Sequence, residues 1–192
     1  MTKARAKGSV FHTTIDFVRA EKGEDVVESV LQRLELTERQ RVESASPTQE
    51  VDFEQVLTLW EAVDAEIGRE DPGWIERSGA HSIGSMGVQL YSGILRKASP
   101  TEFLTQRVSL FKLYYQPGNM EVVEEEEGHA VLRLVGFDYA GPLFCRRQTG
   151  GLSRALEVSG GQEPKTSHVR WVAEGDAFCE WEIRWDYPLP TR

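Results

Sequence analysis

The chain has 192 residues, of which 40% are hydrophobic and 28% are charged, a composition typical of a soluble globular domain. Its formal net charge of −9 argues against broad nucleic-acid binding, because that binding depends mainly on Lys and Arg contacts to phosphates. No apolar run approaches the ~20 residues that span a bilayer, and the N-terminus lacks the apolar region of a signal peptide. We therefore expect one cytoplasmic domain over residues 1–192, with no membrane span and with its two cysteines reduced.

The N-terminal part of the chain is predicted to be mostly helical. Residues 8–18 are the exception, and we expect them to form a short extended or mixed segment. Two acidic residues then open a helix over about 24–34, where they favour the positive end of the helix dipole. A polar turn or two of helix is expected at 37–42. An aspartate caps the next helix, over about 52–67, whose apolar residues follow the i, i+3, i+4 spacing.

The helix expected over about 74–97 is unusual in its glycine content. Each interior glycine costs roughly 1 kcal/mol relative to alanine. The glycines interleave with its apolar stripe at four positions: Gly79, Gly84, Gly87 and Gly93. So many glycines indicate that another backbone or a ligand comes very close to this helix, and close helix packing is the simpler of the two interpretations.

A capping box with proline at its second position, residues 99–102, starts the next helix, which is expected to run to Pro117. From there the apolar residues alternate, which is typical of strands. Short strands at 120–123 and 130–135 are predicted to form a hairpin with a run of four glutamates at its tip. We expect these carboxylates to point into solvent and not to bind a metal.

Another helix begins at Gly141-Pro142, and strands at 167–173 and 178–185 form a second hairpin. The order is then several helices, a hairpin, a crossing helix and a second hairpin. Helices that are segregated from an antiparallel sheet define an α+β domain. We therefore expect helices packed on a four-stranded antiparallel sheet, with the crossing helix between the two hairpins.

The last hairpin can form in two registers. With a three-residue loop at 174–176, Trp171 lies opposite Cys179 and His168 points away from it. With a two-residue loop, His168 and Arg170 would lie on the apolar face instead. Burying unpaired charge costs several kcal/mol, so we expect the three-residue loop.

The cysteines of this region carry a family resemblance. Cys145 near the start of a helix, a following strand, and Cys179 after a Gly-Asp turn resemble the 4-vinyl reductase-type domain. That domain shares a structural group with TRAPP vesicle-tethering subunits and haem-based nitric-oxide sensors. The resemblance implies a zinc site with Cys145 and Cys179 as its outer ligands, but His168 stands in place of a glutamate and Trp171 in place of a third cysteine. We therefore expect no metal, and two buried thiols that act as small hydrophobic side chains.

A second resemblance covers almost the whole chain. The motifs that carry it, in chain order, are Lys7-Gly8, Asp16-Phe17-Val18, the glycine-containing helix, Ser99-Pro100-x-Glu102-Phe103-Leu104, Leu113-Tyr114-Tyr115, Ala130-Val131-Leu132-Arg133-Leu134 with Gly136-Phe137, and Gly175-Asp176-x-x-Cys179-x-Trp181. Together they resemble an uncharacterised family found in multiple copies in myxobacteria. This resemblance implies a TRAPP-like, 4-vinyl reductase-like fold and carries no established activity.

Sequence motifs of the common enzymes are missing. The chain has no His-Glu-x-x-His, no Gly-x-Ser-x-Gly and no Gly-x-Gly-x-x-Gly after a strand. Its four histidines are scattered, and none belongs to a recognisable haem-ligand motif. Cys145 at a helix start could be a reactive thiol, since a helix N-terminus lowers a thiol pKa. We expect a protein that is not an enzyme and has no cofactor.

Two functions remain, and the first is a sensory domain that binds a small apolar or aromatic ligand. Aromatic side chains on inward faces are its candidate pocket: Trp60, His81, Tyr91, Phe111 and Trp171. The second is an interaction or scaffold module that pairs with itself or with a related protein, as TRAPP subunits do. We favour the sensory domain, and in either case we expect a homodimer or a related-protein partner.

Overall fold

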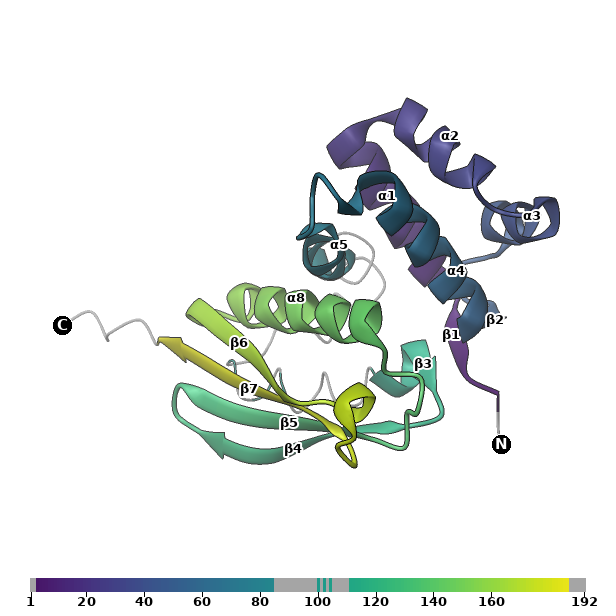
Figure 1. The fold of residues 1–192 in the computed structure, drawn as a ribbon. Helices are drawn as coiled ribbons and strands as arrows, with labels where there is room; N and C mark the ends of the chain where they lie inside the picture. Colours follow the sequence, from purple (N-terminus) through teal and green to yellow (C-terminus); the bar gives the residue numbers. More distant parts are fainter. Residues whose placement is uncertain (1–2, 85–99, 101, 103, 105–110, 187–192) are drawn as a thin grey trace.

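Helices α1 to α4 form a layer that is separated from the main sheet by α5 and α8 (Figure 1). A computed structural model of the chain describes residues 3–84, 100, 102, 104 and 111–186. Its helices before residue 85 are α1 (Ser9–Lys22), α2 (Glu24–Gln32), α3 (Leu36–Ser44), α4 (Phe53–Val63), a π-helical turn (Asp64–Gly68) and α5 (Trp74–Ser82). No helix in the described part of the chain is both long and apolar enough to cross a membrane.

The expected extended or mixed segment at residues 8–18 is wrong, because α1 begins at Ser9 and Gly8 is its N-cap. Val10 and Phe11 lie seven residues before Phe17 and Val18, which is two helical turns, so the four share one buried face. The helices expected at α2 to α4 are confirmed, but the Asp52 side chain makes no capping hydrogen bond and pairs with Lys3 and Arg5 instead. Of the glycine-rich helix, residues 74–84 are described; Gly87, Gly93 and two of the four capping-box residues, 99 and 101, lie outside the described residues.

A small sheet that sequence reasoning missed ties the N-terminus to the middle of the chain. Its order is β2-β1-β3, with β1 (Arg5–Lys7) between β2 (Glu50–Asp52) and β3 (Tyr115–Gln116). Both neighbours of β1 are antiparallel to it, and Ala6 pairs with both of them. Strands of two or three residues are too short to show an alternating pattern.

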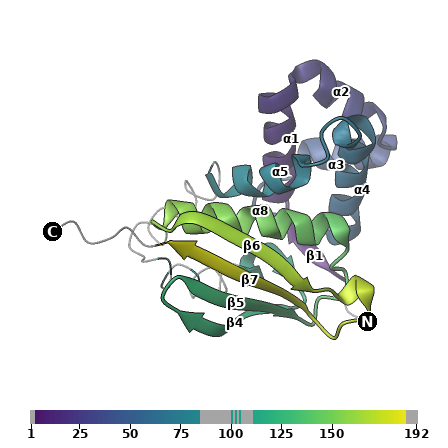
Figure 2. The same ribbon diagram turned by 60° about the vertical axis from the view of Figure 1, so that its left-hand side comes forward.

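The main sheet confirms the four-stranded antiparallel expectation. Its order is β4-β5-β7-β6, built from β4 (Asn119–Glu126), β5 (His129–Val135), β6 (Gln162–Arg170) and β7 (Cys179–Asp186). The crossing helix is α8 (Pro142–Val158), which lies along one face of the sheet (Figure 2). Leu132 pairs with Trp181 and Leu134 with Cys179, and these buried side chains make the face that α8 covers.

The glycines of α5 and α8 bring these two helices into backbone contact. A Cβ atom placed on Gly79 would overlap the carbonyl group of Arg147, and one placed on Gly150 would overlap the backbone of Glu76. Only a residue without a side chain permits this approach. The simpler interpretation of the glycine-rich helix, close packing, is therefore confirmed at Gly79, whereas no described residue would contact a Cβ atom on Gly84.

Candidate functional site

Buried polar side chains gather at one place between the helical layer and the sheet. Among the described residues, seven polar or charged side chains are buried, and six of them come from α1, α5 and α8: Ser9, Thr13, Thr14, Ser78, Arg147 and Gln148. Buried polar groups are rare and require partners. Their concentration at one junction marks this junction as a candidate site.

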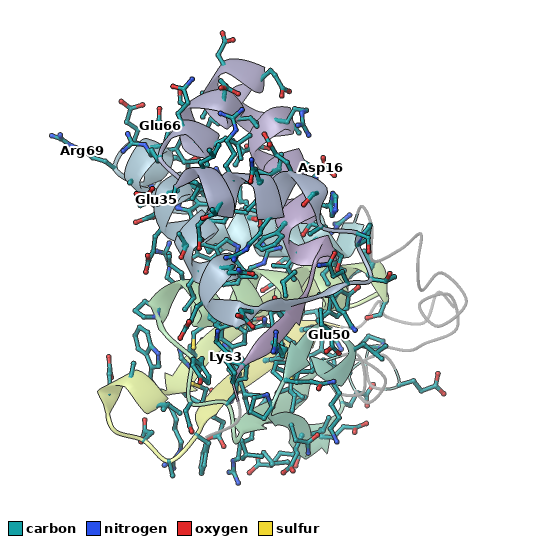
Figure 3. The ribbon with its side chains drawn as sticks, turned by 90° about the vertical axis from the view of Figure 1, so that its right-hand side faces the viewer. Lys3, Asp16, Glu35, Glu50, Glu66 and Arg69 are labelled. Carbon is teal, nitrogen blue, oxygen red and sulfur yellow. The ribbon has the colours of Figure 1, made fainter. Side chains whose placement is uncertain are left out.

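Arg147 is the centre of this cluster. Charged side chains of the helical layer such as Asp16, Glu35 and Arg69 lie at its surface (Figure 3), whereas only 4% of Arg147 is exposed. Its guanidinium donates to the Oγ of Ser78 and, at 3.0 Å, to the Oγ1 of Thr13.

Two aromatic residues complete the surroundings of this guanidinium. The Cζ of Arg147 lies 5.2 Å from the centre of the Trp60 ring, which is a cation–π contact. Burial lowers the pKa of Arg147, and a hydrogen bond with the Tyr115 hydroxyl opposes that effect. All partners of this cation among the described residues are therefore neutral.

A cavity of about 50 Å³ lies beside the guanidinium. It is lined from α1 and α5, from the residues at the start of β3 and from α8: Ser9, Val10, Thr13, Gly79, Ser82, Ile83, Tyr114, Tyr115, Arg147, Gln148 and Gly151. Ser9 and Thr13 are four residues apart on α1, as are Ser78 and Ser82 on α5, so each pair lies on one face of its helix. The lining therefore mixes apolar surface with several hydrogen-bonding side chains.

A second cluster lies at the other side of α8. The Sγ atoms of Cys145 and Cys179 are 3.7 Å apart, and both residues are fully buried. One ring nitrogen of His168 lies within 4.8 Å of both sulfur atoms. The Nε2 atom of this imidazole is buried and has no hydrogen-bond partner in the described part of the chain.

The predicted orientation of His168 is wrong, and a β-bulge is the reason. The expected three-residue loop is wrong, because β6 ends at Arg170 and β7 begins at Cys179, with a 3-10 turn at Val172–Glu174 between them. Arg170 still pairs with Glu180, which is the expected register, and Gly175 takes the expected positive φ of 98°. The register then shifts between Arg170 and His168, so His168 pairs with Trp181 and stacks on its ring at 4.7 Å. The bulge turns His168 toward the cysteines. The expectation of no metal assumed that His168 points away from Cys179, so that argument no longer holds.

The contact between the two thiols shifts their pKa values in opposite directions. A hydrogen bond from Cys145 lowers the pKa of Cys179 to about 5, and contacts with His168 and the backbone N–H of Val172 act in the same direction. The same hydrogen bond and burial raise the pKa of Cys145 far above its usual range. Cys145 is therefore no reactive thiol, and a thiolate on Cys179 is the favoured metal ligand of the pair.

The structure does not gather the predicted pocket residues around one cavity. Trp60 is buried behind Arg147, and Phe111 packs in an aromatic cluster with Tyr115. The ring of His81 lies 5.9 Å from that of Phe17, and the ring of Trp171 lies 5.2 Å from that of His168, in the cysteine cluster. None of these four lines the cavity beside Arg147, and Tyr91 lies outside the described residues.

Sequence reasoning missed the polar cluster because it searched for aromatic side chains. A usable signal was present in the serines and threonines at four-residue spacing within apolar helix faces, at positions 9, 13, 78 and 82. Arg147 gave no such signal, because an arginine on a helix is usually exposed.

Comparison with known proteins identifies the family of this fold. A family model described as haem-NO-binding matches residues 7–130, well over half of the chain. No curated protein matches the chain in sequence. The expected relationship to TRAPP-like, 4-vinyl reductase-like domains and to a myxobacterial family of unknown function is therefore wrong.

Solved structures of H-NOX proteins have the same fold. The Fe(II) unliganded H-NOX protein of K. algicida superposes with a TM-score of 0.71 at 16% identity, covering 97% of this chain and 100% of its own. The S. oneidensis H-NOX protein in its Fe(II)NO state gives 0.72 at 16% identity, covering 94% and 99%. A variant H-NOX protein of T. tengcongensis gives 0.71 at 17% identity, covering 95% and 99%. The fold is thus α+β as expected, but of the H-NOX type.

Haem does not fit the residues that the structure describes at this junction. Haem iron takes an axial His, Cys, Met or Tyr, most often His. Two tyrosines, Tyr114 and Tyr115, line the cavity, and the hydroxyl of Tyr115 bonds Arg147. None of the four histidines lines the cavity: His12 bonds the carbonyl of Ala45, His129 contacts Glu182, and the other two are placed above. A cavity of about 50 Å³ is also far below the roughly 300 Å³ at which drug-sized pockets begin. Arg147 and the polar cluster occupy the junction instead.

Proposed function

The chain belongs to the haem-NO-binding family, and we propose that it is a sensory domain that binds a small molecule between α1, α5 and α8. The convergence of buried polar side chains from these three helices on one cavity carries the proposal. A family defined by ligand binding is consistent with a domain that is not an enzyme, as expected from the absence of catalytic motifs.

The position of the cavity suggests how a ligand would be sensed. Ser9 and Thr13 belong to the helical layer, whereas Arg147 and Gln148 belong to the helix that covers the sheet. A molecule that contacts both groups binds one arrangement of the two layers better than others. Binding therefore shifts the population of these arrangements by the difference in affinity.

The alternative, a TRAPP-like interaction module, loses its support with the TRAPP resemblance. Pairing with a second copy or a related protein remains a prediction that a native mass measurement tests. An apolar or aromatic ligand is also disfavoured, because the cavity carries the charge of Arg147 and the amide of Gln148.

Native mass spectrometry of the purified chain tests the sensory proposal. We expect a small molecule bound to the folded chain and lost on denaturation. A chain that carries nothing in repeated preparations, and whose melting temperature no low-molecular-weight cell extract changes, would overturn the proposal. Added haemin is expected to give no stoichiometric complex with a sharp Soret band, and such a complex would show that the cavity is misassigned.

We propose separately that Cys145, His168 and Cys179 bind zinc. Two thiolates at Zn–S distances of 2.3 Å in a tetrahedron lie about 3.8 Å apart, close to the 3.7 Å observed here. The buried Nε2 of His168 supports the proposal, since a ring nitrogen without a partner is costly away from water. Three protein ligands leave the fourth position for water or another small ligand.

A further inference from the structure

Arg147 is a buried cation with no counter-charge in the described part of the chain. Its partners among the described residues are two hydroxyls, a tyrosine and the face of an indole, and no carboxylate pairs with it. A guanidinium stays protonated in proteins. Neutral partners satisfy N–H donors, but burying an uncompensated charge costs several kcal/mol even after relaxation.

A purely structural role for Arg147 accounts for its hydrogen bonds but not for its charge. A neutral side chain of similar length would pack among α1, α5 and α8 at lower cost. The nearest ion pair on the same helix shows the contrast, because Arg146 bonds both carboxylate oxygens of Glu76. The neighbouring arginine on α8 thus has a carboxylate partner, whereas Arg147 has none among the described residues.

Two further side chains at the cavity have no hydrogen-bond partner among the residues that the structure describes. Gln148 is 6% exposed and Ser9 is 4% exposed, and both line the cavity. Neither side chain makes a hydrogen bond to any residue in the described ranges 3–84 and 111–186. Their polar atoms are not among the fully buried atoms without a partner, so they are open to the cavity or to solvent. There they can bond water or a ligand with acceptor atoms.

The volume of the cavity limits the size of that ligand. A cavity of about 150 Å³ holds benzene, and one of about 50 Å³ holds an ion of three or four non-hydrogen atoms. A guanidinium matches two oxygens on one edge of a planar anion. We propose that this cavity binds a small planar oxyanion, a short carboxylate or an oxyanion of nitrogen, held by Arg147, Gln148 and Ser9.

This inference rests on the proposed sensory function and names the class of its ligand. The test is thermal unfolding of the purified chain, with isothermal titration calorimetry, in formate, acetate, nitrite or nitrate at constant ionic strength. Chloride is the reference salt. We expect at least one of these anions to raise the melting temperature by several degrees, saturably and at millimolar concentration or below. A shift with formate or acetate would identify the ligand as a carboxylate, and a shift with nitrite or nitrate would identify it as an oxyanion of nitrogen.

Variants identify the residue that responds. Arg147→Met is expected to fold and to lose the anion-dependent shift completely, whereas Arg146→Gln, on the same helix, keeps it. Gln148→Leu is expected to weaken binding about tenfold, because it removes a hydrogen bond to a charged group. If Arg147→Met does not fold, the inference is tested by the wild-type titration together with the weaker binding expected of Gln148→Leu.

Three outcomes would overturn the inference: no saturable shift in the wild-type chain, binding only at hundreds of millimolar, or an equal shift in Arg147→Met. A different small molecule found by native mass spectrometry would then leave the sensory function standing without the oxyanion. A chain that is empty in both experiments would overturn both proposals.

Discussion

Gly79 on α5 lies directly against the backbone carbonyl of Arg147 on α8. The reciprocal contact is between Gly150 on α8 and the backbone of Glu76 on α5. The two helices therefore cross backbone to backbone, closer than side chains would permit. Because the contact includes Arg147 itself, it also sets the depth at which the guanidinium sits between the layers.

Alanine at either crossing glycine is expected to destabilise the fold. Gly79→Ala and Gly150→Ala should each lower the free energy of unfolding by about 3 kcal/mol, because the new methyl group overlaps backbone that cannot rotate away. Urea unfolding measures the change. Gly84→Ala is the control: a Cβ there meets no described residue within 4 Å, so helix propensity should raise stability by about 0.5–1 kcal/mol.

The cysteine cluster predicts a defined metal content. Elemental analysis of the chain is expected to find about one zinc per molecule, falling below about 0.2 in Cys145→Ser and Cys179→Ser. His129→Gln should keep the metal, since His129 lies beside Glu182 on the open side of the sheet. A wild-type chain without zinc after purification and zinc dialysis would refute the site.

The pH dependence of zinc binding follows from the two thiols. Cys179, with its pKa lowered to about 5, is already a thiolate above neutral pH, so only the proton of Cys145 must leave. Zinc affinity should therefore rise about tenfold per pH unit between pH 7 and 8. Two thiols of ordinary pKa would give about a hundredfold. Competition with a chromogenic chelator distinguishes the two slopes.

Asp71 is expected to stabilise the helical layer in a pH-dependent way. Its carboxylate accepts from Arg77 at 2.5 Å and from Lys22 at 2.9 Å, and the contact with Arg77 is the main cause of its lowered pKa. A depressed pKa stabilises the folded state above the unfolded pKa of about 3.9, and this contribution disappears as pH falls through the folded pKa.

The variant Asp71→Asn should therefore cost about 1 kcal/mol at pH 7, since both cationic partners are partly exposed to solvent. The difference from wild type should shrink below pH 4. Glu157→Gln removes an exposed pair with Arg154 and should change stability by less than about 0.5 kcal/mol at either pH. A constant cost of Asp71→Asn from pH 7 to pH 3 would contradict the assignment.

Trp60 links the helical layer to the buried arginine. Its indole Nε1 donates to the Oγ1 of Thr14 at 3.1 Å, and its ring faces Arg147. Trp60→Phe should lower the free energy of unfolding by about 2–3 kcal/mol, from a lost buried hydrogen bond and a cavity. Trp171→Phe, at a half-buried position, should cost less than half as much in the same denaturant titration.

Long periodic segments were predictable from sequence, and short or mixed ones were not. The alternation in β5 and β7 and the start of α8 at Pro142 predicted the main sheet and its crossing helix. In residues 8–18 the apolar side chains at two-turn spacing were hidden by an intervening run of β-branched residues. One bulged residue between His168 and Arg170 was enough to reverse the side on which His168 lies.

The sequence by itself determined the α+β class, the two hairpins, the spacing of the cysteines and the glycines that permit a close helix crossing. These follow from local periodicity and backbone freedom. Only the tertiary structure decided where the polar side chains meet, since Arg147 bonds residues 69 and 134 positions away. The reason is physical: a serine, a threonine and an arginine in separate amphipathic helices become a site only when packing removes water from all three together.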